Sequence, residues 1–118
     1  MPDVKLSTDI RQMADGVRVI DISGEITAFS EEELAGAHEE AGRGASAVVL
    51  NFENLDYMNS GGIGLLVTTL IRAQRSGHAL RAYGLSEHYR EIFSLTRLDE
   101  AIQIYDDEAS AISAEPHP

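Results

Sequence analysis

A short and almost uninterrupted apolar run limits most strongly what this chain can fold into. The run spans Ala45–Phe52 and reads Ala-Ser-Ala-Val-Val-Leu-Asn-Phe, directly after one predicted helix and shortly before another. Side chains that are apolar at successive positions cannot alternate between core and solvent, so such a strand is buried on both faces. A buried strand between two helices is typical of a parallel sheet covered by helices, and we expect it at the centre of an α/β domain.

The segments on either side of this strand fit the same layered plan. Leu6–Met13 and Gly16–Ser23 are predicted strands, and Asp15-Gly16 between them predicts a tight hairpin turn. The order ββαβαβαβα predicts a mostly parallel sheet of about five strands with four helices. Residues 1–114 form one domain in this reading, and 115–118 are a disordered tail. The other predicted elements are helices at 30–44, 60–75, 86–95 and 106–114, strands at 79–83 and around 104, and a loop at 53–59.

Two of the helices begin with capping signals. Ser30 is followed three residues later by Glu33, which is the spacing of a capping box. Ser86 precedes the third helix and is predicted to cap it.

Composition narrows the classes of partner. The 118 residues include 9 Lys and Arg against 20 Asp and Glu, a formal net charge of −11. This excess argues against nucleic acid or an anionic membrane and favours a protein partner with a basic surface. The absence of cysteine excludes disulfides, thiolate catalysis and cysteine-bound metal. With neither a signal peptide nor an apolar run of about 20 residues, we expect a cytoplasmic protein.

The most unusual segment is Asn59-Ser60-Gly61-Gly62-Ile63-Gly64, at the predicted start of the second helix. Glycine in a helix interior costs about 1 kcal/mol relative to alanine, so three in four positions suggest that backbone approaches another group closely. The segment lacks the Gly-Lys-Ser/Thr of a phosphate-binding loop and the spacing of a dinucleotide fingerprint. From spacing alone it is either a functional loop or a helix start packed tightly on the sheet.

The residues around this segment resemble the STAS family, whose best-known members are the bacterial anti-sigma factor antagonists. The similarity rests on Asp56–Leu66 after the strand Val48–Phe52, and on Gly24-Glu25-Ile26 after the second strand. Gly77–Gly84 and the helix after it match the family's late strand and helix. The resemblance covers nearly the whole chain in order and spacing.

The resemblance implies a binding protein without catalytic activity or cofactor. Such an antagonist binds an anti-sigma factor, usually a serine kinase of ATPase-like fold, and thereby releases a sigma factor. The kinase phosphorylates the antagonist on the serine of the motif, and a phosphatase resets it. On this chain that serine is Ser60, with Asn59, Gly61, Gly62 and Gly64 as the switch loop and helix start. Phosphate at a helix N-terminus is electrostatically favourable, so the domain should tolerate it.

The second helix also suggests a contact surface. At about 100° per residue, a stripe of apolar residues is predicted to face the sheet, and Leu65, Thr69 and Arg72 fall on the opposite face. Together with Met58 they are the predicted partner-binding residues. The stripe consists of Ile63, Leu66, Val67, Leu70, Ile71 and Ala73.

Three positions differ from the family motif. Asn59 replaces an Asp, Gly61 replaces a second Ser or Thr, and Thr27 replaces the Asp of Gly-Glu-Leu-Asp. These differences keep open an alternative function, a STAS scaffold or regulatory module that is not switched by phosphorylation. We expect a monomer in the absence of a partner.

An enzyme with Ser60 as nucleophile would need a nearby base. The histidines are predicted to be surface residues away from Ser60, and the acidic clusters at 38–40 and 106–108 lack metal-ligand spacing. The histidines are His38, His78, His88 and His117.

Overall fold

Five strands form one sheet with the order β1-β2-β3-β4-β5 in the computed structural model, which describes residues 6–114. β1 and β2 are antiparallel, and the other neighbouring pairs are parallel. The strands are β1 (Leu6–Gln12), β2 (Val17–Ile26), β3 (Ala47–Met58), β4 (Ala79–Tyr83) and β5 (Gln103–Tyr105). The predicted hairpin is confirmed, with Asp15 and Gly16 both at positive φ in its turn. The predicted tail at 115–118 lies outside the described residues.

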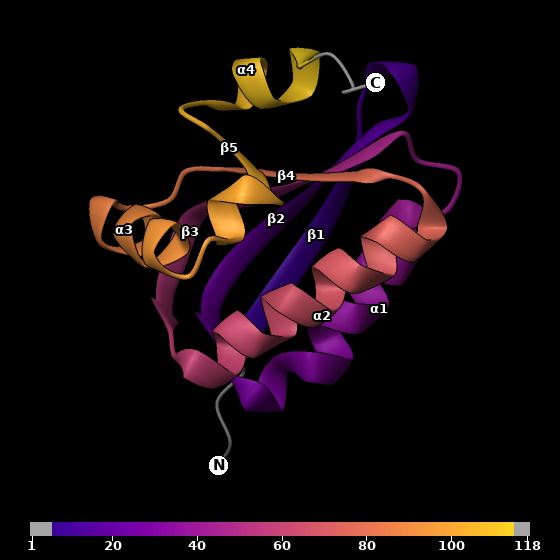
Figure 1. Cartoon of the computed structure of the whole chain (residues 1–118). Helices are drawn as coiled ribbons and strands as arrows, with labels where there is room; N and C mark the ends of the chain where they lie inside the picture. The colour runs from indigo at the N-terminus through magenta and orange to yellow at the C-terminus, as the bar shows by residue number, and fades with distance from the viewer. Residues whose placement is uncertain (1–5, 115–118) are drawn as a thin grey trace.

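Helices cover both faces of this sheet unequally (Figure 1). Successive right-handed crossovers step across a sheet in one direction, which places their helices on the same face. The helices α1 (Glu31–Gly42), α2 (Ser60–Ser76) and α3 (Glu87–Leu95) accordingly pack on one face, and the short α4 (Glu108–Ser113) packs on the other. The prediction of an α/β sheet of five strands with four helices is confirmed. Among the helices of residues 6–114, none is long and apolar enough to cross a membrane.

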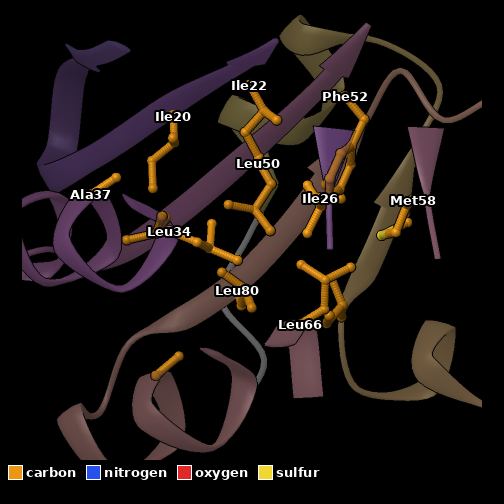
Figure 2. Packing of buried hydrophobic residues seen from close by; sticks show 14 of the residues in the cluster. Ile20, Ile22, Ile26, Leu34, Ala37, Leu50, Phe52, Met58, Leu66 and Leu80 are labelled. Atoms are coloured by element: carbon orange, nitrogen blue, oxygen red, sulfur yellow. The ribbon is translucent and has the colours of Figure 1, made fainter. Parts of the chain in front are cut away.

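The central strand β3 is buried on both faces, as its sequence predicts. Val48, Leu50 and Phe52 belong to the larger apolar cluster under α1 and α2, while Ala47 and Val49 face α4. In Figure 2 the labelled side chains of the strands and those of α1 and α2 point toward one another, with the helices supplying Leu34, Ala37 and Leu66. The larger cluster therefore fixes both helices on the sheet.

β3 is longer than predicted, because the segment 53–58 is strand and not loop. Its residues pair with the end of β2, where Gly24 lies opposite Leu55 and Ile26 opposite Met58. One register shift precedes the first of these pairs, and a second lies between them. Glu53, Asn54 and Asp56 are exposed, so the sequence has the polar composition of a loop although long-range pairing makes it a strand.

α4 is tied to the sheet by an ionic network around one arginine. The Arg11 guanidinium donates to the Asp21 carboxylate at 2.7 Å and to the Glu108 carboxylate at 2.6 Å. The Tyr83 hydroxyl donates to Glu108 at 2.6 Å, and the Asn51 amide donates to Asp21 at 2.8 Å. Arg11 thereby holds the pKa of both carboxyl groups below the usual range. The predicted acidic cluster at 106–108 thus contributes a structural carboxylate.

The predicted capping box at α1 is wrong, although Ser86 does cap α3, accepting from the Tyr89 N–H. Ser30 makes no capping bond to α1. Its hydroxyl oxygen accepts from the Thr27 N–H at 3.0 Å, inside a short 3-10 turn at Ala28–Ser30 that precedes the helix. Glu33 accepts from the Thr8 hydroxyl on β1 instead. The box is shifted three residues upstream because Thr27 begins this extra turn.

Candidate functional site

The glycine-rich segment forms the turn from β3 into α2, beside the end of β2. The Asn59 N–H donates to the Ile26 carbonyl at 3.3 Å and so ends the ladder between the two strands. The Asn59 side chain then accepts from the Gly62 N–H at 3.0 Å and caps α2. Ser60 is the first residue of the helix and is exposed. The turn therefore presents the Ser60 hydroxyl to solvent at the carboxyl edge of the sheet.

Two of the three glycines are required because neighbouring backbone lies against them. A Cβ at Gly62 would stand 2.2 Å from the Ile26 carbonyl oxygen, and a Cβ at Gly61 would stand 2.9 Å from the Ala28 backbone nitrogen. At Gly64 nothing lies within 4 Å of the Cβ position. The tight-packing interpretation therefore holds for Gly61 and Gly62, and their contacts fix the start of α2 against the end of β2.

The turn that follows β2 forms the second wall of the site. Thr27 accepts from the Phe29 N–H at 3.2 Å, so a threonine hydroxyl caps this turn at the position where the family motif has Asp. The turn leaves Phe29 96% exposed, the most exposed large apolar side chain of the described residues. Since the backbone of Ala28 lies against Gly61, the turn that carries Phe29 packs beside the start of α2.

The prediction of which side of α2 faces the sheet is wrong, because the helix is rotated about its own axis relative to that prediction. The sequence predicts Thr69 on the side of α2 that is turned away from the sheet, but it is buried at 3% exposure, and Leu65 packs against the main apolar cluster. Val67 and Ile71 were expected against the sheet but are 39% and 43% exposed. The contact of Gly62 with Ile26 rotates the helix, and Thr69 tolerates burial because its hydroxyl donates to the Leu65 carbonyl at 2.8 Å.

The other two predicted contact residues are divided between core and surface. Met58 is 5% exposed, and its side chain belongs to the main cluster (Figure 2). The hydroxyl of Tyr89 on α3 accepts from the Met58 N–H at 2.8 Å. Arg72 is exposed, near the far end of α2 from Ser60. The structure therefore does not gather Met58, Leu65, Thr69 and Arg72 into one exposed face.

A different set of residues forms an exposed stripe that begins at Ser60. Gly64, Val67 and Ile71 follow it at spacings of four, three and four residues, which places all four on one side of α2. Phe29 is a further exposed apolar side chain, in the turn that packs against the helix start. We call Phe29, Ser60, Gly64, Val67 and Ile71 the outer face. The spacing from Ser60 is visible in the sequence, but the apolar character of Val67 and Ile71 predicts that they belong to the core.

Two histidines also differ from the prediction, since His38 and His78 are buried. Their Nε2 atoms lie 2.9 Å apart, which joins α1 to the residue that follows the C-cap of α2. Burial, then His78 and Arg72, lower the pKa of His38 to about 4, and burial lowers the pKa of His78. This pair is near the opposite end of α2 from Ser60. Within residues 6–114, no three His, Cys, Asp or Glu side chains are placed to hold a metal ion.

The fold and this site define the class of protein. The chain belongs to the STAS domain family, whose model matches residues 10–111. Among curated proteins, the anti-sigma-B factor antagonist of Bacillus subtilis (strain 168) is 26% identical over 101 residues, covering 86% of this chain and 92% of that protein. The resemblance seen in the sequence is thereby confirmed.

Solved structures share the same fold. An anti-sigma factor antagonist from Mycobacterium paratuberculosis superposes with a TM-score of 0.73 at 24% identity, covering 92% of each chain. The phosphorylated form of the Bacillus cell fate determinant SpoIIAA superposes with a TM-score of 0.68 at 20% identity, covering 90% of this chain and 96% of that one. These likenesses establish that the sheet and helices are arranged as in anti-sigma factor antagonists.

Proposed function

We propose that this chain is an anti-sigma factor antagonist that works by reversible protein binding and has no catalytic activity of its own. In this proposal the unphosphorylated chain binds an anti-sigma factor, a serine kinase of ATPase-like fold, and a sigma factor is released. The kinase ends the interaction by phosphorylating Ser60, and a phosphatase restores binding. The cycle takes place in the cytoplasm, with the chain monomeric when unbound and without nucleic acid or membrane as partner.

The observation that carries the proposal is the position of Ser60 at the head of the outer face. Its hydroxyl is exposed at the first residue of α2, where a kinase can reach it. Helix N-termini favour anions because their N–H groups are not used within the helix and the dipole is positive there. A phosphate on Ser60 is therefore compatible with the fold.

The outer face supplies a reason why phosphate would end binding. Val67 and Ile71 are exposed apolar side chains on the same side of α2 as Ser60, and Phe29 is exposed in the turn that packs against the helix start. A partner that covers them would also have to bury a phosphate of about −1.5 to −2 charges. Desolvation of that charge, with repulsion from the nucleotide phosphates of a kinase, opposes the complex. This surface replaces the predicted set, and Met58 and Thr69 serve the core.

Asn59 and Gly61 favour a second candidate, a STAS scaffold that binds partners without a phosphorylation switch. Asn59 supplies the cap but has no carboxylate to orient the Ser60 hydroxyl. The two candidates make opposite statements about Ser60 and can be separated by one measurement.

The experiment is intact-mass spectrometry after incubation with ATP, magnesium and lysate of the source cell. The variants are Ser60→Ala and, as a matched control, Ser86→Ala, which removes another exposed serine at a helix start. We expect one added phosphate on the wild type and on Ser86→Ala, and none on Ser60→Ala. No phosphate on any chain, with an active control substrate, would support the scaffold.

A further inference from the structure

A hollow of about 630 Å³ lies at the end of α1 and α2 that is remote from Ser60. α2 has 17 residues and is therefore about 25 Å long, so the hollow is separate from the outer face. Its volume falls in the range of about 300–1,000 Å³ that small-molecule sites occupy. The arginine, glutamate and histidine side chains that line it are His38, Glu39, Arg43, Arg72, Arg75 and His78.

The hollow concentrates positive charge on an acidic chain. It contains three of the chain's 9 Lys and Arg residues but one of its 20 Asp and Glu residues, a local balance of 3 − 1 = +2. Arg11, Arg90 and Arg97 are each paired with carboxylates. Within residues 6–114, no carboxylate lies within salt-bridge distance of Arg43, Arg72 or Arg75.

The buried histidine pair forms one wall of the same hollow. His38 and His78 are 4% and 7% exposed, and one Nε2 donates to the other across 2.9 Å. The Nδ1 atom of His78 is buried and has no hydrogen-bond partner among the described residues. A buried polar atom without a hydrogen-bond partner is uncommon in folded proteins. A cation is disfavoured as the ligand of this hollow, because three guanidinium groups would repel it and the two neutral imidazoles add no negative charge.

We propose that this hollow binds a small phosphate-bearing molecule through Arg43, Arg72 and Arg75. Guanidinium groups match phosphate oxygens with paired N–H donors, and three of them can neutralise a group that carries two or more charges. The ligand would bridge the C-terminal end of α1 to the last turns of α2. The proposal concerns a site separate from Ser60 and is independent of the proposed partner.

The arginines also have a simpler role, because cations near helix C-termini compensate the negative end of the dipole. That role predicts no ligand, so a binding measurement separates the two. We would titrate inorganic pyrophosphate, ADP and citrate into the full chain at low salt and record calorimetry together with the imidazole resonances by NMR. His88 is exposed and outside the hollow, and it serves as the internal reference.

We expect pyrophosphate and ADP to bind and to shift the signals of His38 and His78 but not those of His88. Affinity should fall about tenfold or more in Arg72→Gln/Arg75→Gln, because this variant removes two of the three guanidinium groups. The control Arg90→Gln/Arg97→Gln changes net charge equally on the α3 side and should leave affinity unchanged. Tighter binding of ADP than pyrophosphate would identify a nucleotide as the ligand, and equal binding would identify the phosphate groups alone.

Three results would overturn the proposal. The first is no binding of either phosphate ligand at about 10 mM, which would leave the arginines as helix-end charges. The second is equal loss of affinity in the two double variants, which would indicate non-specific attraction. The third is equal binding of citrate, which would show that the hollow selects charge and not phosphate.

Discussion

The carbonyl oxygen of Ile26 lies against the Cα of Gly62, so closely that a Cβ on residue 62 would stand 2.2 Å from it. This contact joins the last residue of β2 to the first turn of α2. It holds the Ser60 hydroxyl at the carboxyl edge of the sheet and sets the rotation of the helix. The candidate site therefore depends on a backbone contact between segments that are far apart in sequence.

Substitutions at two glycines of this helix should have opposite effects on stability. Gly62→Ala places a methyl group against backbone that cannot move cheaply, and we expect a loss of about 2 kcal/mol or more. Gly64→Ala meets nothing within 4 Å and should stabilise the domain by up to about 1 kcal/mol through helix propensity. Urea unfolding followed by circular dichroism measures both. Similar changes at the two positions would show that the contact with Ile26 does not constrain the helix.

The cap of α2 can be tested with two substitutions of Asn59. Asn59→Ala removes the oxygen that accepts from the Gly62 N–H, and we expect a loss of about 1 kcal/mol in the free energy of unfolding. Asn59→Asp keeps the acceptor and adds a negative charge at the helix N-terminus, which should contribute about 0.3–1 kcal/mol. Thermal unfolding of the two variants and the wild type measures these changes in stability. An Asp variant less stable than the Ala variant would contradict it.

Charges placed on the outer face should weaken partner binding and leave the fold intact. Val67 and Ile71 are exposed, so Val67→Glu and Ile71→Glu should change stability by no more than about 0.5 kcal/mol. Each should reduce affinity for the proposed anti-sigma factor partner at least about tenfold, the effect expected at an interface centre. Leu95→Glu is the control, because Leu95 is 77% exposed on α3. Calorimetry with the proposed kinase should show an unchanged affinity for Leu95→Glu. If Leu95→Glu loses as much affinity as Val67→Glu and Ile71→Glu, the outer face is not the specific interface.

The buried histidine pair should make stability depend on pH. The pKa of His38 is about 4 in the folded chain, below the ordinary value of 6.5. As pH falls from about 7 to 4, the unfolded chain therefore binds this proton first, and stability decreases by up to about 3 kcal/mol. Below pH 4 both states are protonated and this contribution changes no further. His78, whose pKa is also lowered, acts in the same direction.

The matched variants are His38→Gln and His88→Gln, compared by urea midpoints between pH 7.5 and 4.5. Carboxylates contribute equally to all three chains, so the difference in slope reports the histidine. We expect a shallower pH dependence in His38→Gln and an unchanged one in His88→Gln, which replaces an exposed imidazole. Parallel curves for all three proteins would rule out the buried pair as the source.

Local signals predicted the order of elements and the position of Ser60 correctly. The buried run at 45–52, the Asp15-Gly16 turn and the helix start after Asn59 each depend on neighbours within a few residues, so they can be read from the chain. Family resemblance then placed the serine of the motif at the start of α2. These features share one physical basis, because short-range sterics and capping determine them.

Tertiary contacts decided which way the site faces. Burial of Thr69 and exposure of Val67 and Ile71 follow from the contact of Gly62 with a carbonyl on another strand, which no helical periodicity reveals. The extension of β3 through 53–58 depends on pairing with β2, and the burial of His38 depends on His78, forty residues away. The sequence alone determined where the helix begins and which hydroxyl it carries. Packing between distant segments determined the surface that surrounds that hydroxyl, because side-chain burial depends on neighbours that only the folded chain brings together.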